Sequence, residues 1–329
     1  MKPIHDILHL YGISGGKAKP LAGGLINKTW KIQTKKQSYI LQWVNPIFSQ
    51  KIMNDLEAVT AHLKKKDFLT IEIIKTKNKK LYVPDVEGFW RLYTFIPGVI
   101  YEDAHSQKIA REAGRVLGQF HKALSDLKHK FNYSRPLHRE SGKIYKKYLN
   151  ALNKYPDIFD EKFKKEAYHM NDLPKLILSS ALPRRITHGD PKIPNIIFNK
   201  NNQAVTLIDL DDCGNRHSVL VDIGDALRSF SMNKDSSFSL NRYRRLLEGY
   251  FSGSKGLLTE KEKKLIPQSL KLITLELAAR FAIDMAEDFY FSWDKKKYAS
   301  RRDHNRALVL ELMKFYRDIC KHEKELIYE

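Results

Sequence analysis

Residues 184–214 read RRITHGDPKIPNIIFNKNNQAVTLIDLDDCG, a stretch in which short apolar runs alternate with acidic and amide side chains. The runs 184–188, 195–199 and 204–210 have the length and the β-branched content of strands. Clustered carboxylates are costly to bury without compensating charge, so surface turns would be the simplest interpretation. The spacing of the polar residues favours a functional interpretation of this stretch.

Asp190 follows His188 by two positions and precedes Asn195 by five, which gives the pattern HxDxxxxN. In this pattern one carboxylate can accept a hydroxyl proton while an amide oxygen on the same loop binds a metal ion. Asp209 and Asp211 end the next apolar run, where they supply the oxygen ligands that Mg²⁺ prefers. Together these residues predict a phosphoryl-transfer site.

The first 97 residues are predicted to form a β-rich lobe with one helix. Turn signals separate apolar runs into two expected hairpins, 21–34 with 37–44 and 80–86 with 88–96. Between the hairpins, Ile52, Leu56, Val59 and Leu63 recur at helical spacing. This organisation is that of a small sheet with one accompanying helix.

Helical periodicity dominates after the hinge-like Ile96-Pro97-Gly98. The expected helices are 105–127, further helix through Tyr168, then 173–182, 220–230, 240–251, 272–291 and 304–319. The fold class is therefore predicted to be α+β, with an N-terminal lobe at 1–97, a larger helical lobe at 98–329 and a cleft between them.

The composition limits the classes of function. The 329 residues carry a net charge of +20, but the lysines are spread along the chain without a helix-turn-helix, zinc or RNA-recognition signature, so no nucleic-acid partner is expected. A basic surface also suits a small anionic ligand such as a nucleotide. With no bilayer-spanning apolar run, no secretory signal and only Cys213 and Cys320, the expectation is a cytoplasmic protein without a membrane partner, monomeric or homodimeric.

The 184–214 segment resembles the kinase-like phosphotransferase superfamily, which includes aminoglycoside phosphotransferases, choline kinases and protein kinases. The resemblance implies a bilobal protein-kinase-like fold that uses ATP and Mg²⁺, with Asp190 as the catalytic base. It further implies that Asn195 and Asp209 bind Mg²⁺, and that Asp211 is a second candidate at the metal or the acceptor. Lys192 stands where protein kinases place a lysine that touches the transferred phosphate; a solvated loop lysine is the alternative.

Only residues 213–221 separate the acidic cluster from the next helical run. Protein kinases need a longer segment there to present a peptide, so a small-molecule acceptor is favoured. Within the superfamily, a residue like Asp222 fixes the catalytic loop through backbone hydrogen bonds, and His188 would brace that loop. Asp225 could do the same or stabilise the helix N-terminus by its charge.

A closer resemblance covers most of the chain and is carried by the motifs GLINKTWKI, YILQWVN, LEAVTAHL, FWRLYTFIPG, THGDPKIPNIIF, VTLIDLDD, DIGDALRS, RFAIDMAEDFYF and DHNRA. In this order they resemble the N-acetylhexosamine 1-kinases, which phosphorylate the anomeric hydroxyl of N-acetylglucosamine or N-acetylgalactosamine. The resemblance implies the following nucleotide-binding residues: Gly23, Gly24 and Asn27 in the loop over the phosphates, Phe95 and Ile96 at the adenine, and Glu57 as the helix glutamate.

Two positions depart from the family pattern. Gln42 occupies the strand position where most superfamily members place a lysine that holds the α- and β-phosphates, so Lys192 and the metal ions would have to compensate more phosphate charge. The loop also reads HGD, with Pro191 and Pro194, where that family has HND. Because this loop lies beside the acceptor in that family, the departure concerns the choice of sugar.

A sugar pocket is expected near the C-terminus. Arg280, Asp284 and Glu287 lie about one helical turn apart on one face, and Arg306 lies in a region that the family uses to contact the sugar. Either Tyr290 or Phe230 could supply an aromatic platform. Salt-bridged helix packing is the alternative for the charged residues.

Two further classes of function stay open. An aminoglycoside-type or choline-type phosphotransferase would need an acidic acceptor face, and this basic chain offers little acid there beyond Asp211, Asp212 and Glu287. A non-catalytic kinase-fold interaction module is favoured by Gln42 but opposed by the intact catalytic and metal-binding residues.

Overall fold

An antiparallel sheet forms the N-terminal lobe of the computed structural model, which describes residues 2–21 and 27–326. Its strands are β1 (Lys17–Leu21), β2 (Lys28–Gln33), β3 (Ser38–Val44), β4 (Ile73–Ile74), β5 (Val83–Pro84) and β6 (Phe89–Thr94). The order is β1-β2-β3-β6-β4, with β5 also paired to β6. The pairings of β2 with β3 and of β5 with β6 confirm both predicted hairpins.

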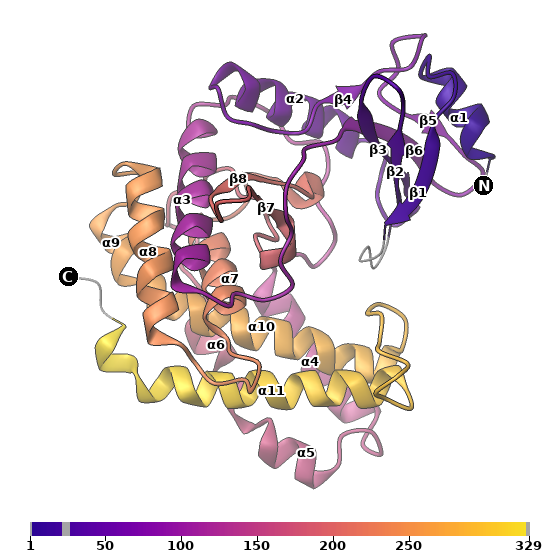
Figure 1. The fold of residues 1–329 in the computed structure, drawn as a ribbon. Coiled ribbons are helices and arrows are strands. Elements are labelled where there is room, and N and C mark those ends of the chain that lie inside the picture. Colours follow the sequence, from indigo (N-terminus) through magenta and orange to yellow (C-terminus); the bar gives the residue numbers. More distant parts are fainter. Residues whose placement is uncertain (1, 22–26, 327–329) are drawn as a thin grey trace.

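Two helices accompany this sheet (Figure 1). The predicted helix is α2 (Ile52–Lys65), whose apolar stripe is buried and joins the core of the larger lobe. The short helix α1 (Ile4–Leu10) was not predicted, because seven residues carry too little periodicity to stand out. It packs Ile7 and Leu8 against side chains of the sheet in a core cluster separate from that of the larger lobe.

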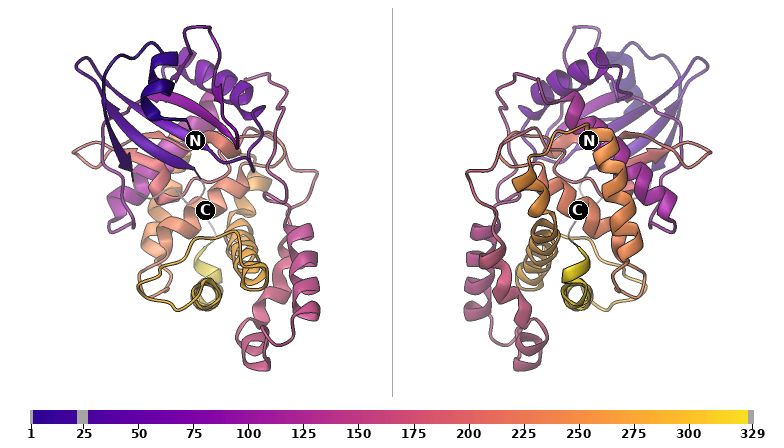
Figure 2. Two further views of the ribbon diagram at one scale, coloured as in Figure 1. Left: turned by 90° about the vertical axis from the view of Figure 1, so that its right-hand side faces the viewer. Right: turned by 90° about the vertical axis from the view of Figure 1, so that its left-hand side faces the viewer.

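The larger lobe is helical around one small β-ribbon. Its helices are α3 (Gln107–Ala123), α4 (Ser141–Lys154), α5 (Glu161–Glu166), α6 (Leu173–Leu176), α7 (Leu220–Ser231), α8 (Leu240–Ser254), α9 (Glu260–Lys264), α10 (Ile266–Glu287) and α11 (Arg301–Lys321). The ribbon pairs β7 (Ile196–Phe198) with β8 (Ala204–Leu207), and single 3₁₀ turns lie at 168–172, 193–195, 210–212 and 323–325. Figure 2 shows the sheet of the small lobe above these helices in two further directions.

Two predicted elements differ in the structure. The expected strand 184–188 makes only one isolated bridge, between Thr187 and Gly214, because its partner is the irregular segment after β8. The expected helix 173–182 ends at Leu176, and beyond it the Ser179 hydroxyl accepts a hydrogen bond from the Ala181 amide. Such local side-chain bonding competes with helix continuation.

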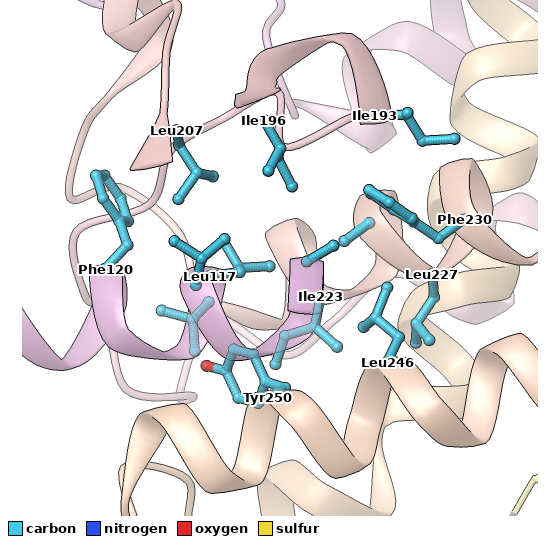
Figure 3. Packing of buried hydrophobic residues seen from close by; sticks show 14 of the residues in the cluster. Leu117, Phe120, Ile193, Ile196, Leu207, Ile223, Leu227, Phe230, Leu246 and Tyr250 are labelled. Atoms are coloured by element: carbon cyan, nitrogen blue, oxygen red, sulfur yellow. The ribbon is translucent and has the colours of Figure 1, made fainter. Parts of the chain in front are cut away.

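The core of the larger lobe lies directly beneath the β-ribbon (Figure 3). Leu117 and Ile223 project from α3 and α7 toward Ile196 and Leu207 of the ribbon, and all four are buried. Phe230 belongs to the same cluster and has no exposed surface. The suggestion that Phe230 forms a sugar platform is therefore wrong, because its ring is fully buried in the core and has no surface left to contact a sugar.

The connection between the lobes is fixed to the ribbon. After β6 the chain passes through Gly98, where a Cβ atom would lie 2.2 Å from the Ile197 side chain. Val99 then exchanges backbone hydrogen bonds of 2.7 and 2.9 Å with Phe198. The hinge-like segment is thus anchored beside the β7–β8 ribbon. The boundary between the lobes at residue 97 stays an interpretation.

Within the described residues no helix has both the length and the hydrophobicity needed to cross a bilayer.

Candidate active site

The loop before β7 is held by a buried carboxylate on α7. Asp222 accepts hydrogen bonds from the backbone amides of His188 (2.5 Å) and Gly189 (3.0 Å), and His121 Nε2 lies 2.9 Å from the same carboxylate. Burial by itself would raise the pKa of Asp222, but the bond and charge of His121 and the charge of His188 hold that pKa below its ordinary value. These contacts match the loop-fixing role that the sequence resemblance implied for Asp222.

A second buried group holds the loop from the other side. Arg139 donates to the carbonyl of Gly189 (2.8 Å) and pairs with Asp225 of α7 (2.7 Å) and Glu276 of α10 (3.4 Å). Asp225 also pairs with Arg228 at 2.8 Å, so its charge is used in an ion-pair network. Sequence reasoning missed Arg139, because it lies in an irregular segment far from the motif.

Glycine at position 189 has a steric cause. Its φ of +90° lies in the left-handed region, and a Cβ there would be 2.6 Å from Cβ of Asp212. The HGD sequence of this loop therefore permits close packing against the acidic cluster.

The predicted catalytic and metal-binding side chains of the loop lie close together. Lys192 Nζ lies 2.7 Å from Asp190 Oδ2, and the side-chain amide of Asn195 donates to the carbonyl (2.8 Å) and to Oδ2 (3.2 Å) of Asp190. Asp190 keeps 25% of its side-chain surface exposed, which leaves it accessible to an acceptor. Burial lowers the pKa of Lys192, but the charge and hydrogen bond of Asp190, together with the charges of Asp209 and Asp225, raise that pKa overall.

Asp209 stands opposite the loop with excess negative charge around it. Asp209 lies two residues after β8 and has φ +65°. The residue is exposed to solvent, but the protein atoms around its carboxylate reduce the hydration of that group. This desolvation, followed by the charges of Asp211 and Asp190, raises the pKa of Asp209 to about 7. A carboxylate in such surroundings favours a cation.

The oxygen donors fit a nucleotide-bound Mg²⁺. Asn195 uses its amide nitrogen on Asp190, so its carbonyl oxygen is the atom left to hold a cation beside Asp209. Among residues 2–21 and 27–326, no three His, Cys, Asp or Glu side chains form a metal-binding group alone. Mg²⁺ commonly takes one or two carboxylates together with substrate phosphates, which agrees with this sparse set.

Asp211 has a different partner from Asp209. Both of its oxygens accept hydrogen bonds of 2.7 Å from Arg91 of β6, and both side chains are almost fully buried. Arg91 pairs in register with Gln42 of β3, and Arg91 Nε donates to Gln42 Oε1 at 3.0 Å. The bidentate pair joins the two lobes, so a metal-binding role for Asp211 stays a prediction.

Sequence reasoning missed Arg91, although its place was informative. It is the one charged residue of β6, whose neighbours are apolar or aromatic and buried. A charge in such a strand requires a buried partner. It supplies a cation opposite Gln42, on the strand next to the one where the superfamily lysine was expected.

The remaining nucleotide-site predictions have mixed outcomes. Asn27 lies with its amide 3.5 Å from Asp211, and Phe95 and Ile96 follow β6 at the connection between the lobes, with Lys31 Nζ 3.8 Å from the Phe95 ring. Gly23 and Gly24 lie outside the described residues. Glu57 differs from its predicted role: it faces the surface, where it pairs with Lys75 at 2.6 Å.

A polar cluster lies next to the catalytic loop on the side away from the sheet. Arg135 donates to Tyr290 Oη (2.7 Å), to Asp212 Oδ2 (2.6 Å) and to His138 Nδ1 (2.8 Å). Arg280 reaches the same Tyr290 oxygen at 3.4 Å. The structure thus brings the predicted Arg280 and Tyr290 to a cluster that sequence reasoning did not foresee, since Arg135 and His138 lie in an irregular segment.

The other predicted acceptor residues have structural contacts. Asp284 accepts from the backbone amides of residues 289–291 and from Asn305, which fixes the segment after α10. Arg306 pairs with Asp160 beside α5, and Glu287 pairs with Lys147. A substrate contact by Asp284 or Arg306 stays a prediction that these contacts do not favour.

Fold and site together define a class: phosphotransferases built on the bilobal kinase fold. Within that class, the phosphotransferase enzyme family matches residues 17–255, which is most of the chain, and the chain belongs to this family.

Solved structures share the fold over nearly the whole chain. A microcompartment-associated aminopropanol kinase has a TM-score of 0.73 at 15% identity, covering 99% of this chain and 98% of that chain. An amicoumacin kinase solved with AMP-PNP and Ca²⁺ has 0.63 at 17%, covering 92% and 89%. The ethanolamine kinase of Plasmodium vivax has 0.60 at 14%, covering 92% and 84%. At these identities the similarity establishes the fold.

Proposed function

We propose that this phosphotransferase is an ATP- and Mg²⁺-dependent kinase whose acceptor is a sugar hydroxyl, with the anomeric 1-hydroxyl of an N-acetylhexosamine as the expected target. The observation that carries the reaction type is the Asp190 loop, fixed by Asp222 and Arg139 opposite Asp209. The N-acetylhexosamine itself rests on the motif resemblance from GLINKTWKI to DHNRA.

The chemistry follows from the positions of the side chains. The acceptor oxygen forms a bond to the γ-phosphorus as the bond from that phosphorus to the β,γ-bridging oxygen breaks. ADP leaves with the electron pair, and Asp190 takes the hydroxyl proton. Asn195 and Asp209 would hold Mg²⁺, which neutralises phosphate charge when bound. Lys192 lies on the same loop and forms an ion pair with Asp190. Its ammonium group would therefore be near enough to Asp190 to pair with the transferred phosphate.

The acceptor is inferred to be small. The chain passes from β8 through one 3₁₀ turn and residues 213–219 directly into α7, which leaves no extended segment to present a peptide. The structural relatives named above are kinases of aminopropanol, ethanolamine and amicoumacin, which supports a small-molecule acceptor as well.

An amino-alcohol or aminoglycoside acceptor is the second candidate, and those same relatives favour it. The cluster beside the catalytic loop opposes it, because Arg135 and Arg280 present hydrogen-bond donors and like charge to a cationic ligand, and the Asp212 carboxylate of the cluster is already paired with Arg135.

A phosphate-transfer screen tests the proposal. The purified protein with Mg-ATP would be given N-acetylglucosamine, N-acetylgalactosamine, other monosaccharides, aminoglycosides, choline and ethanolamine. ADP release accompanied by loss of the reducing end in an N-acetylhexosamine is the expected result. Turnover of only an amino alcohol or aminoglycoside would replace the sugar proposal with the second candidate. Tight ATP binding without turnover of any acceptor would favour the interaction module.

A further inference from the structure

We propose that Asp55 is a positioning residue for phosphoryl transfer. From helix α2 of the small lobe it holds the segment 129–139, and that segment supports the loop of Asp190. The inference rests on the proposed function, because it takes this loop to be the place of the reaction. Asp55 would thus make the connection between α2 and the site that the family resemblance implied for Glu57.

The carboxylate of Asp55 is almost fully buried and points into the larger lobe. Its oxygens accept hydrogen bonds from the backbone amides of Asn132 and Tyr133 at 3.0 Å and from the Asn132 side chain at 2.9 Å, and they lie 2.8 Å from His129 Nε2. All these partners lie in the irregular segment after α3. Glu57, two residues further along the helix, faces the surface instead. Turning Asp55 away would leave a buried charge without partners, so this contact is firm.

The segment needs such an anchor, because its backbone is unusual. Leu137 has φ +61° and Arg139 has φ +56°, in the left-handed region that side-chain-bearing residues seldom adopt. Backbone of this kind persists only where the surrounding structure fixes it. Asp55 fixes the beginning of the segment, and the ring centre of Tyr133 lies 6.4 Å from that of Phe48, just before α2. The small lobe therefore holds the beginning of the segment.

The far end of the same segment holds the reacting loop. Arg139 donates to the carbonyl of Gly189 at 2.8 Å, and Arg135 pairs with Asp212 at 2.6 Å. Asp212 in turn packs against Gly189, where an added Cβ would lie only 2.6 Å from Cβ of Asp212. Arg135 lies two residues beyond the backbone amides held from α2. A shift of those amides would thus reach Gly189, the residue before Asp190.

Loss of the anchor should affect the chemical step more than nucleotide binding. A general base acts only within hydrogen-bond reach of the acceptor hydroxyl, and a misplacement of about 1 Å can cost about a hundredfold in rate. Asp222 would still hold the amides of His188 and Gly189, so the loss should be partial. None of the residues predicted to bind the nucleotide belongs to the segment 129–139.

The first test measures kcat per folded molecule and KM for Mg-ATP, with N-acetylglucosamine as acceptor and the folded fraction determined by circular dichroism. Asp55→Asn keeps the shape but replaces one accepting oxygen by a donor; kcat should fall about five- to tenfold, with KM within about twofold of the wild type. Asp126→Asn is the matched control. Asp126 also joins α2 to the larger lobe, through His62 and Lys66, but it is exposed and precedes the segment, so kcat should not change.

A milder variant covers the case in which Asp55→Asn does not fold. Asn132→Ala removes one donor to Asp55 from an exposed residue and leaves both backbone donors in place. It should fold and reduce kcat about twofold to threefold, again without a change in KM for Mg-ATP.

The second test is amide hydrogen exchange and needs no acceptor. The amides of His188 and Gly189 report on the loop, and those of Leu246 and Tyr250 in α8 report on global unfolding. Asp55→Asn should speed exchange at the two loop amides by at least about tenfold more than at the two α8 amides. Asp126→Asn should change both pairs alike.

The outcomes separate this inference from the proposed function. An unchanged kcat in both Asp55→Asn and Asn132→Ala, or loop amides that follow the α8 amides, would overturn the inference and leave the kinase intact, with Asp55 joining the lobes only. If the wild type does not turn over N-acetylglucosamine, the proposed sugar is lost, while the exchange test still decides whether Asp55 positions the loop.

Discussion

The two lobes form two walls of the candidate phosphoryl-transfer site, and they present charge to it in different ways. On the wall of the larger lobe, the loop of Asp190 is fixed by Asp222 and Arg139, and the predicted catalytic side chains come from one short stretch of sequence. On the wall of the small lobe, Gln42 occupies the expected lysine position and the cation is Arg91 of the neighbouring strand. A catalytic loop thus depends on local sequence, whereas a charge on a sheet can move to an adjacent strand if the register keeps it facing the site.

The largest effect is expected at the link between the walls. Arg91→Met leaves the buried Asp211 without its bidentate partner and should lower the free energy of unfolding by about 3–5 kcal/mol, measured by urea denaturation. The double variant Arg91→Met/Asp211→Leu removes both charges and should recover most of that loss. Equal destabilisation of the single and double variants would contradict a paired charge at this contact.

A smaller change in free energy is expected on the wall of the larger lobe, but it decides whether the protein functions. Asp190→Ala should reduce turnover by at least about a hundredfold, or roughly 2.7 kcal/mol, because the acceptor loses its general base. Mg-ATP binding by calorimetry and the melting temperature should change little, since Asp190 and its partner Lys192 are both partly exposed. Undiminished turnover would remove Asp190 from the mechanism.

The smallest effect is expected at Glu57, where the resemblance and the structure disagree. Glu57→Ala breaks an exposed ion pair with Lys75 and should alter the free energy of unfolding by less than about 0.5 kcal/mol, without weakening Mg-ATP binding. Lys75→Ala is the matched control and should behave alike. A large loss of ATP affinity in Glu57→Ala alone would restore its predicted role at the nucleotide.

Much of the fold follows from sequence periodicity. The hairpins β2–β3 and β5–β6 and the helices α2 and α3 lie where alternation and helical spacing predict them. The missed elements α1, β1, β4 and α9 are short or mainly exposed, so they carry little pattern. Strand 184–188 failed for another reason: its apolar character serves packing without a continuous partner strand.

The site residues also divide into those that the sequence predicted and those that it misjudged. Asp190, Asn195 and Asp209 were predicted from spacing and Lys192 from the family resemblance; residues on one loop and the adjoining strand end lie close together in the structure as well. Phe230 was misjudged, since a sequence pattern does not tell which side chains of a helix are buried in the core. Glu57 was placed by the family resemblance, which does not show its ion pair with Lys75 at the surface.

By itself, the sequence determined the reaction class, the two-lobed α+β organisation and the loop that carries the chemistry. All of these depend on contacts between residues near one another along the chain. Only the tertiary structure decided that Arg91 faces Gln42 and Asp211 and that Arg139 supports Gly189. Those pairings join residues far apart in sequence, and the strength of a charge interaction depends on distance and burial, which a linear pattern does not contain.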